Sequence, residues 1–471
     1  MKPAESADVP TRTTAELIRR YDVPGPRYTS YPTAVSFHES FGEAEYRERL
    51  ARADERGDEP LSLYAHLPFC EARCLYCGCN VVISPHREVA QPYLAHLLRE
   101  LDLLAEALPR RRRLSQMQWG GGTPTYYGTP DLTRLFRAIA ERFTFTDDAE
   151  IGIEVDPRVT SFEQVDALAG LGFNRISAGV QDFDPAVQEA IGRVQSFEQT
   201  QALVERARAA GFRSVNLDLI YGLPLQSKEG FGRTLERMLE IRPERVAVYS
   251  FAFVPWLKGH MRRIDPASLP GPELKLELLA LAYDAFTGAG YSAVGMDHFA
   301  LPEDDMAGAA DAGTLSRNFM GYTVQSAHDL VGIGITAIGD VSDAFVQNLK
   351  KLPAYYAALD AGRFPVERGY ALDDDDRVRR FVIAEIMCNA RLDFAAVEAR
   401  FGVSFERDFA AELATLGAPG GPIADGLLEP VPGGLRITAR GRPFVRVVAM
   451  VFDRHLRTAS AGTRPVFSRT V

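Results

Sequence analysis

The chain has 471 residues, of which 46% are hydrophobic and 25% charged, a composition typical of a globular protein large enough for two or three domains. Its formal net charge of −10 argues against a general nucleic-acid-binding or anionic-membrane surface. There is no apolar run long enough to insert into a membrane and no secretory signal at the N-terminus, so we expect a cytoplasmic protein.

An N-terminal arm is predicted over residues 1–55, which contain several prolines and the segment GPRYTSYPT. Buried-strand patterns then alternate with helical patterns. The predicted strands are 61–67, 115–119, 150–155, 173–179, 213–220, 245–252 and 291–296. The predicted helices are 90–107, 130–142, 161–170, 196–210, 228–241 and 273–288. Repeated strand–helix units predict an α/β fold, a partial TIM-like (βα) barrel with parallel strands, which together with its extension covers residues 56–370.

The last part of the chain, residues 371–471, predicts a mostly helical, winged-helix-like domain. It begins with the acidic run Asp373–Asp376, which favours a helix N-terminus. More helices, a hairpin with a Pro-Gly-Gly turn and a final helix follow. We interpret this domain as a cover over the site. A second charged run, Arg110–Arg113, is predicted to be a solvated loop.

Four of the five cysteines lie within ten residues, which argues for metal or redox chemistry rather than a disulfide framework. Cys70, Cys74 and Cys77 have the spacing Cys-x3-Cys-x2-Cys directly after the first barrel strand. Three thiolates on one loop suit three irons of a cubane and leave the fourth iron open. The alternative is a structural zinc site with Cys79 as fourth ligand. Cys388 is expected to be a small buried side chain.

Glycines and polar residues follow the later strands. In the turn WGGGTPTY, three glycines would let the backbone approach a ligand closely, although a tight turn alone would also use them. Glu154, Gln181 and Asp218 lie at strand ends, where barrel active sites form, and Arg193 follows a short helix. Glu154 could accept a ribose hydroxyl or an ammonium proton. Arg193 and Asp218 could clamp a carboxylate and an ammonium or ribose group.

The cysteine pattern, with the aromatic Tyr76 before the third cysteine, resembles the radical S-adenosylmethionine superfamily. Nearly the whole chain resembles one of its families, the oxygen-independent coproporphyrinogen III oxidases. The matching segments are GPRYTSYPT, QWGGGTP, IEVDPR, GVQDF, DLIYGLP, GMDHF, RNFMGYT and FSR. The resemblance implies oxidative decarboxylation of two propionate side chains of coproporphyrinogen III, which gives the vinyl groups of protoporphyrinogen IX.

The resemblance also implies one 4Fe-4S cluster, held by Cys70, Cys74 and Cys77, and two molecules of S-adenosylmethionine. The residues implied for the cluster-bound molecule are Tyr64, Gly121, Glu154 and Ile338. Those implied for the second molecule are Tyr76, Gly122, Thr123, Gln181, Arg193, Asp218 and Ala252. Tyr64, His66 and Glu154 are the candidate catalytic residues, and Arg27 is a candidate contact to the carboxylates of a tetrapyrrole substrate. An electron donor such as flavodoxin or ferredoxin is expected, and the chain is expected to be a monomer.

Two positions depart from the family pattern. Met320 stands where the family usually has glutamine, and Phe253 where it tends to have histidine. These departures favour the alternative function of a related radical methyltransferase or cyclopropane-forming enzyme. A haem chaperone is a further alternative, but such proteins typically lack the fourth cysteine and the GPRYTSYPT arm that this chain has.

Overall fold

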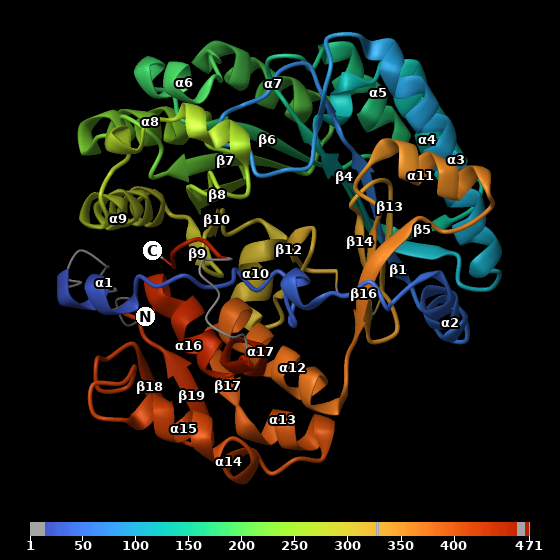
Figure 1. Cartoon of the computed structure of the whole chain (residues 1–471). Coiled ribbons are helices and arrows are strands. Elements are labelled where there is room, and N and C mark those ends of the chain that lie inside the picture. Colours follow the sequence, from blue (N-terminus) through green and yellow to red (C-terminus); the bar gives the residue numbers. More distant parts are fainter. Residues whose placement is uncertain (1–14, 326, 328, 459–466, 471) are drawn as a thin grey trace.

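A computed structural model describes residues 15–325, 327, 329–458 and 467–470 (Figure 1). The first fourteen residues of the predicted arm, and residues 459–466 and 471 of the predicted C-terminal domain, lie outside this part of the chain. The described residues form an α/β fold around a twelve-stranded sheet in the order β16-β15-β14-β13-β1-β4-β5-β6-β7-β8-β10-β9.

Six parallel strands, each close to a predicted range, form the centre of this sheet. They are β1 (Leu61–Leu67), β4 (Arg113–Gly121), β5 (Thr144–Val155), β6 (Arg175–Gln181), β7 (Ser214–Tyr221) and β8 (Arg245–Ser250). The helices between them cover the outer face of the curved sheet (Figure 1). These are α3 (Gln91–Ala107), α4 (Thr129–Ala140), α5 (Phe162–Leu171), α6 (Pro185–Ile191), α7 (Phe197–Ala210) and α8 (Lys228–Ile241). The partial barrel predicted from the sequence is thus confirmed.

Local sequence explains where the barrel helices begin and end. Ser161 and Ser196 form capping boxes at the starts of α5 and α7. Gly172 and Gly211 end the same helices in the left-handed conformation that glycine adopts without strain. Each helix therefore stops within a few residues of the next strand, so the carboxyl ends of the strands gather at one edge.

Strand alternation separates the core of the barrel from its lumen. On β1, Leu61, Leu63 and Leu67 pack in the main hydrophobic core, whereas Tyr64 and His66 share the opposite face. Register places Tyr64 opposite Gln118 of β4, and Glu154 of β5 opposite Ser177 of β6. The inner face of the barrel is consequently lined with polar side chains.

The two edges of the sheet differ from the prediction. The range 291–296 was expected to continue the parallel series, but β9 (Ser292–Val294) forms an antiparallel hairpin with β10 (His298–Ala300). The three residues between them are too few for the crossover that parallel strands need. At the other edge, β13 (Leu330–Ile333) pairs parallel with β1. The remaining edge strands, β14 (Ile338–Asp340), β15 (Ala344–Asn348) and β16 (Val366–Ala371), are antiparallel.

The run Arg110–Arg113 is only partly the solvated loop that the sequence predicts, because Arg110 and Arg113 are exposed but Arg111 is not. Arg111 is fully buried and forms an ion pair with Asp329, just before β13. Its guanidinium also donates to backbone carbonyls after α2 (Glu43–Asp54), and Asp54 accepts its backbone N–H at 3.0 Å. The partner that draws Arg111 inward lies more than two hundred residues away, which a local pattern does not reveal.

The C-terminal segment is mostly helical and has a small antiparallel sheet. Its helices are α12 (Asp374–Asn389), α13 (Phe394–Phe401), α14 (Phe405–Asp408), α15 (Ala410–Gly417), α16 (Val445–Val451) and α17 (Arg454–Thr458). The sheet order is β17 (Arg391–Asp393), β19 (Gly434–Ile437) and β18 (Leu428–Val431). The predicted hairpin is β18–β19, Asp373 caps α12 as expected of the acidic run, and Cys388 is buried.

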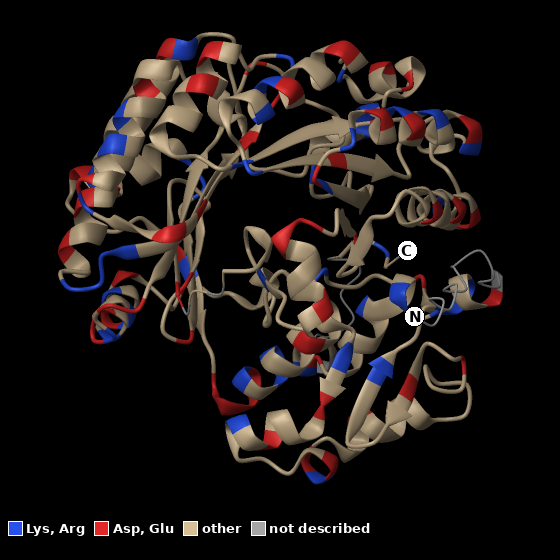
Figure 2. Cartoon of the chain, turned by 180° about the vertical axis from the view of Figure 1, so that it is seen from behind, with Lys and Arg blue, Asp and Glu red and all other residues tan. Residues whose placement is uncertain are grey.

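A second hydrophobic core joins this segment to the N-terminal arm. Leu17, Ile18 and Tyr21 of α1 (Ala15–Tyr21) pack with residues of α12 and α16. The arm then runs between the barrel and the C-terminal segment towards α2 (Figure 1). No described helix is both long and apolar enough to cross a membrane. Acidic and basic residues are interspersed along the outer helices (Figure 2).

Candidate active site

The cysteine loop connects two short parallel strands, β2 (Phe69–Cys70) and β3 (Val82–Ile83). Its position is fixed by a backbone hydrogen bond of 2.8 Å from Leu75 to Ile191 at the end of α6. Cys74 is buried, Cys70 and Cys77 are half-buried, and Cys79 is exposed. The loop therefore holds the three spaced cysteines in less exposed positions than the fourth.

Two arginines donate to the sulfur of Cys74. Arg158 approaches it to 3.6 Å and Arg193 to 3.7 Å. Asp156, directly after β5, holds both guanidinium groups, at 2.6 Å from Arg158 and 3.0 Å from Arg193. Asp156 and Arg158 were not among the predicted site residues, although both lie in the segment IEVDPR that carries the resemblance.

The other two cysteines have different surroundings. Burial raises the pKa of the Cys70 thiol to about 11, although its sulfur lies 3.4 Å from the hydroxyl of Thr123. A hydrogen bond with Cys79 lowers the pKa of Cys77 to about 6. Three thiols on one loop, with a hydroxyl and two guanidinium groups at their sulfurs, fit a 4Fe-4S cluster. Within the described residues, no group of three or more His, Cys, Asp or Glu side chains is gathered as a preformed site for one metal ion.

Tyr64 and His66 link the inner face of β1 to the cysteine loop. The Nε2 atom of His66 lies 3.1 Å from the carbonyl oxygen of Asn80, and its Nδ1 lies 3.1 Å from the Tyr64 hydroxyl. A carbonyl oxygen only accepts, so Nε2 carries the proton and Nδ1 accepts from Tyr64. Burial lowers the pKa of His66 to about 4, so the imidazole is neutral near pH 7. The pair holds the end of the cysteine loop against β1.

The three glycines after β4 are packed against the protein itself. A Cβ on Gly120 would lie 2.7 Å from the carboxyl group of Glu154, and one on Gly121 would lie 2.4 Å from the ring of His66. A Cβ on Gly122 would lie 2.5 Å from the backbone of Pro68. The close approach that the glycines permit is therefore first an approach to Glu154, His66 and the cysteine loop.

Glu154 lies at the centre of this edge of the barrel. Its carboxylate accepts the backbone N–H of Gly121 at 3.1 Å, and its side chain remains accessible from the lumen. The surrounding protein raises the pKa of Glu154 to about 7, an effect to which the charges of Asp218 and Cys77 add. A carboxyl group poised near neutrality can accept a hydrogen bond from a cation or a hydroxyl when it is ionised.

Gln181, at the end of the neighbouring strand β6, and Arg193, which follows α6, are both buried beside Gly179. Arg193 donates at 2.7 Å to the carbonyl of Gly179, and a Cβ on that glycine would collide with the Gln181 amide. Gln181 has a positive φ of 71°, a conformation that is strained for a residue other than glycine. The Oε1 atom of Gln181 and the Nε atom of Arg193 are buried without a hydrogen-bond partner in the described structure. Such orphaned atoms beside an open lumen are expected where a ligand binds.

Asp218 faces the lumen one strand further along. It accepts from Asn216 at 2.7 Å, and burial raises its pKa to about 6. Arg193 is bound to Asp156 and to the carbonyl of Gly179, and a clamp of Arg193 and Asp218 on a ligand stays a prediction. Asp218 remains near the lumen as a half-buried acceptor.

The remaining predicted residues surround the same edge. Tyr76 packs with Phe253 in a small apolar cluster, and Ala252 is half-buried just before Phe253. The Ile338 backbone lies beside Gly332, the partner of Tyr64 on β13. The structure thus brings the predicted residues from seven strands or strand ends to one edge of the barrel.

Two features concern the substrate side of the site. Arg27 of the arm donates at 2.6 Å to the carbonyl of Ser250 at the end of β8, and its own carbonyl accepts from Arg317. Met320 lies at the turn between β11 (Ser316–Asn318) and β12 (Gly321–Thr323), where its N–H donates to the side chain of Asn318. The arm and this hairpin therefore lie against the open side of the barrel.

Two family models match the chain. Residues 64–238 match the radical SAM superfamily, and residues 372–444 match the HemN C-terminal domain. The oxygen-independent coproporphyrinogen III oxidase of Pseudomonas aeruginosa is 43% identical over 98% of this chain and 99% of its own length. The Escherichia coli oxidase is 44% identical over 94% of this chain and 95% of its own length. The chain belongs to the oxygen-independent coproporphyrinogen III oxidase family.

A solved structure agrees with this membership. Coproporphyrinogen III oxidase (HemN) from Escherichia coli, described as a radical SAM enzyme, superposes with a TM-score of 0.87 at 43% identity. The match covers 91% of this chain and 97% of that one. Enzymes of this family use a 4Fe-4S cluster and S-adenosylmethionine. The match reaches the C-terminal segment, so it involves more than the shared barrel.

Proposed function

We propose that this chain is an oxygen-independent coproporphyrinogen III oxidase. It converts two propionate side chains of coproporphyrinogen III to vinyl groups and so gives protoporphyrinogen IX in haem biosynthesis. The proposal is carried by the contact between the cysteine loop and the polar end of the barrel, where His66, Glu154 and Gly121 pack together. Family membership supplies the substrate class.

Cys70, Cys74 and Cys77 would hold the cluster, and Tyr64, Gly121, Glu154 and Ile338 would line the site of the S-adenosylmethionine bound to it. When bound, the cluster and S-adenosylmethionine would supply the radical that removes a hydrogen atom from the substrate propionate. Glu154, ionised, would accept from the ammonium or ribose of the cofactor. Neutral His66, fixed by Asn80 and Tyr64, would keep the loop in register without adding charge beside the site.

A second S-adenosylmethionine would lie towards β6 and β7. The orphaned Oε1 of Gln181 could accept a hydrogen bond there, while Asp218 offers a carboxylate. Tyr76, Gly122, Thr123, Arg193 and Ala252 would complete the surroundings. Arg193 would act mainly through Cys74 and Asp156, because those contacts and Gly179 already engage its guanidinium.

The substrate would enter from the side where the arm crosses the barrel. Arg27 is the candidate contact to a propionate carboxylate, since a guanidinium can pair with it in a bidentate manner. The C-terminal segment would help to close this side. We also propose that the protein acts as a cytoplasmic monomer and receives electrons from a carrier such as flavodoxin or ferredoxin.

An anaerobic assay tests the reaction. Reconstituted protein is mixed with reductant, S-adenosylmethionine and coproporphyrinogen III, and the products are identified by mass spectrometry. We expect protoporphyrinogen IX, carbon dioxide and 5′-deoxyadenosine. Formation of 5′-deoxyadenosine without decarboxylation would keep the radical chemistry but contradict the substrate, and S-adenosylhomocysteine would point to methyl transfer.

A further inference from the structure

The segment after β8 forms part of the surface over the cysteine loop. The Nε2 atom of His260 lies 2.9 Å from the carbonyl of Cys77, and the ammonium of Lys258 lies 3.4 Å from the carbonyl of Cys79. Both contacts are to the backbone of the loop that carries the proposed cluster ligands. The segment is therefore joined to the cluster loop by two hydrogen bonds, which makes this surface a short route for an electron.

The segment combines buried apolar side chains, which anchor its backbone, with exposed basic side chains. Met261 and Ile264 are buried in the same small apolar cluster as Tyr76. Between them Arg262 and Arg263 are exposed on a short 3-10 helix, Gly259–Arg263. The buried anchors fix the backbone, so the direction in which the two arginines project is set by the fold.

The surface is basic in an otherwise acidic chain. Lys258, Arg262 and Arg263 carry positive charge within the segment, and exposed Arg73 on the cysteine loop adds to it. Lys258 donates to the carbonyl of Cys79, and Arg73 donates at 3.5 Å to the carbonyl of Val81 in the same loop. The chain as a whole has a formal net charge of −10, and its outer helices carry mixed charges (Figure 2). A local positive field of this kind steers an acidic partner.

The basic residues border an exposed apolar pair. Trp256 is 37% exposed and Leu257 is 60% exposed, and they directly precede Lys258. A partly exposed tryptophan beside arginines is the composition in which protein contacts concentrate binding energy. Electron-transfer complexes are typically small and transient, so a patch of this size suits one.

We propose that Arg73 and residues 256–263 form the docking surface for an acidic one-electron carrier protein of low potential. This inference rests on the proposed function, because it assumes a cluster on Cys70, Cys74 and Cys77. In each encounter one electron leaves the reduced carrier and one electron enters the cluster. No atom is transferred, so the carrier is oxidised by one electron and the cluster is reduced by one.

The test compares two double charge reversals in the reconstituted holoenzyme. Arg262→Glu with Arg263→Glu reverses the patch, and Arg134→Glu with Arg137→Glu reverses two exposed arginines of α4 as a matched control. Affinity for purified flavodoxin, used as the acidic carrier, is measured anaerobically by calorimetry at several salt concentrations. We expect the patch variant to raise Kd about tenfold or more and to flatten its salt dependence, and the control to change Kd less than about twofold.

Two further measurements separate this inference from the proposed function. With dithionite as reductant, the patch variant should form 5′-deoxyadenosine at the wild-type rate, whereas with reduced flavodoxin it should be slower by about the same factor as its loss of affinity. Trp256→Ala should also weaken flavodoxin binding. Absence of dithionite-driven 5′-deoxyadenosine in the wild type would contradict the proposed function instead.

Other occupants of the patch would appear as different results. Equal flavodoxin affinity in the wild type and the patch variant would overturn the inference. The inference would also be overturned if the patch variant kept its flavodoxin affinity and lost only self-association, measured by sedimentation, or only binding to phosphatidylglycerol vesicles.

Discussion

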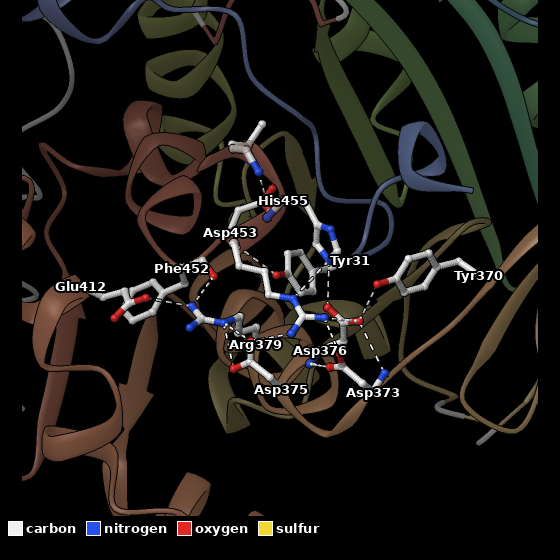
Figure 3. Close-up of polar contacts among 12 residues, drawn as sticks. Tyr31, Tyr370, Asp373, Asp375, Asp376, Arg379, Glu412, Phe452, Asp453 and His455 are labelled. Atoms are coloured by element: carbon white, nitrogen blue, oxygen red, sulfur yellow. Dashed lines mark hydrogen bonds and ion pairs between the residues drawn. The ribbon is translucent and has the colours of Figure 1, made fainter. Parts of the chain in front are cut away.

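The end of the barrel and the junction around α12 both bury charged side chains, but they differ in how completely these are paired. At the junction, Asp376 is fully buried and lies 2.9 Å from each of Tyr370, Arg454 and His455 (Figure 3). At the barrel end, buried atoms of Gln181 and Arg193 have no partner in the described structure.

This difference separates a structural network from a ligand site. The junction network continues from Arg379 to Glu412 at 2.9 Å (Figure 3). Tyr28 of the arm donates to Asp453 at 2.9 Å, so the network ties the arm to the C-terminal helices. A buried network whose members are paired fixes one arrangement. Buried polar atoms without a hydrogen-bond partner, such as those of Gln181 and Arg193 near the carboxyl group of Glu154, instead indicate a place where a ligand supplies the missing hydrogen bonds.

The largest expected effect is at the barrel end. Cys77→Ala should remove the cluster and abolish 5′-deoxyadenosine formation, because two cysteines of the loop do not suffice to hold it. The same change should lower the free energy of unfolding of the cluster-free protein by less than about 1 kcal/mol, since Cys77 is only half-buried. Iron analysis, product assay and urea unfolding measure these effects. Full iron content and activity in the variant would contradict the assignment of Cys77.

The largest effect on stability should come from the junction. Asp376→Ala should lower the free energy of unfolding by about 1–3 kcal/mol, because Tyr370 and His455 lose their buried acceptor, while Arg454 keeps its ion pairs with Asp373 and Asp375. Asp374→Ala is the control, because that side chain is 92% exposed in its ion pair with Arg377, and it should cost less than about 1 kcal/mol. Equal costs in urea unfolding of the two variants would show that the network does not stabilise the junction.

A smaller effect at the barrel end depends on pH. Glu154 has a pKa near 7, raised by burial, so it loses its negative charge as the pH falls through that value. S-adenosylmethionine affinity should therefore be highest above pH 7 and fall by up to about tenfold below it, to the level of the neutral side chain. Glu154→Gln should weaken binding about tenfold at pH 8 and remove this dependence, whereas the exposed Glu163→Gln should change neither. A wild-type affinity that is flat from pH 6 to pH 8 would exclude an ionised Glu154 from binding.

The smallest effect concerns the arm. Arg27→Ala should raise KM for coproporphyrinogen III about threefold to tenfold without changing S-adenosylmethionine affinity, because one carboxylate contact among several is lost. Arg52→Ala, on the exposed face of α2, should leave KM unchanged. If substrate affinity in Arg27→Ala equals that of the wild type, Arg27 serves only its contact with Ser250.

The sequence predicts the barrel well because each of its strands and helices has a recognisable hydrophobic periodicity, and several helices have capping residues at their ends. The ranges 61–67 and 213–220 nearly coincide with β1 and β7, and the cysteine loop is readable because its spacing is local. The edge strands β14 and β15 were missed, since strands of three to five residues show no clear alternation.

Contacts between segments that are distant in the chain could not be predicted from local sequence patterns either. The burial of Arg111 depends on Asp329, and the close packing of Gly121 depends on the ring of His66, a partner that appears only once β1 and β4 pair. Asp156 was passed over for the same reason, because its role follows from its contacts with Arg158 and Arg193. Residue types therefore predicted which strand ends are polar, but not which polar groups already bind each other.

The most direct test of the account is the stoichiometry of the anaerobic reaction with coproporphyrinogen III. One hydrogen atom is removed for each propionate, so the account predicts two 5′-deoxyadenosine molecules for each protoporphyrinogen IX, with two S-adenosylmethionine molecules bound per cluster before turnover. One bound S-adenosylmethionine, or 5′-deoxyadenosine that accumulates while coproporphyrinogen III stays intact, would contradict it.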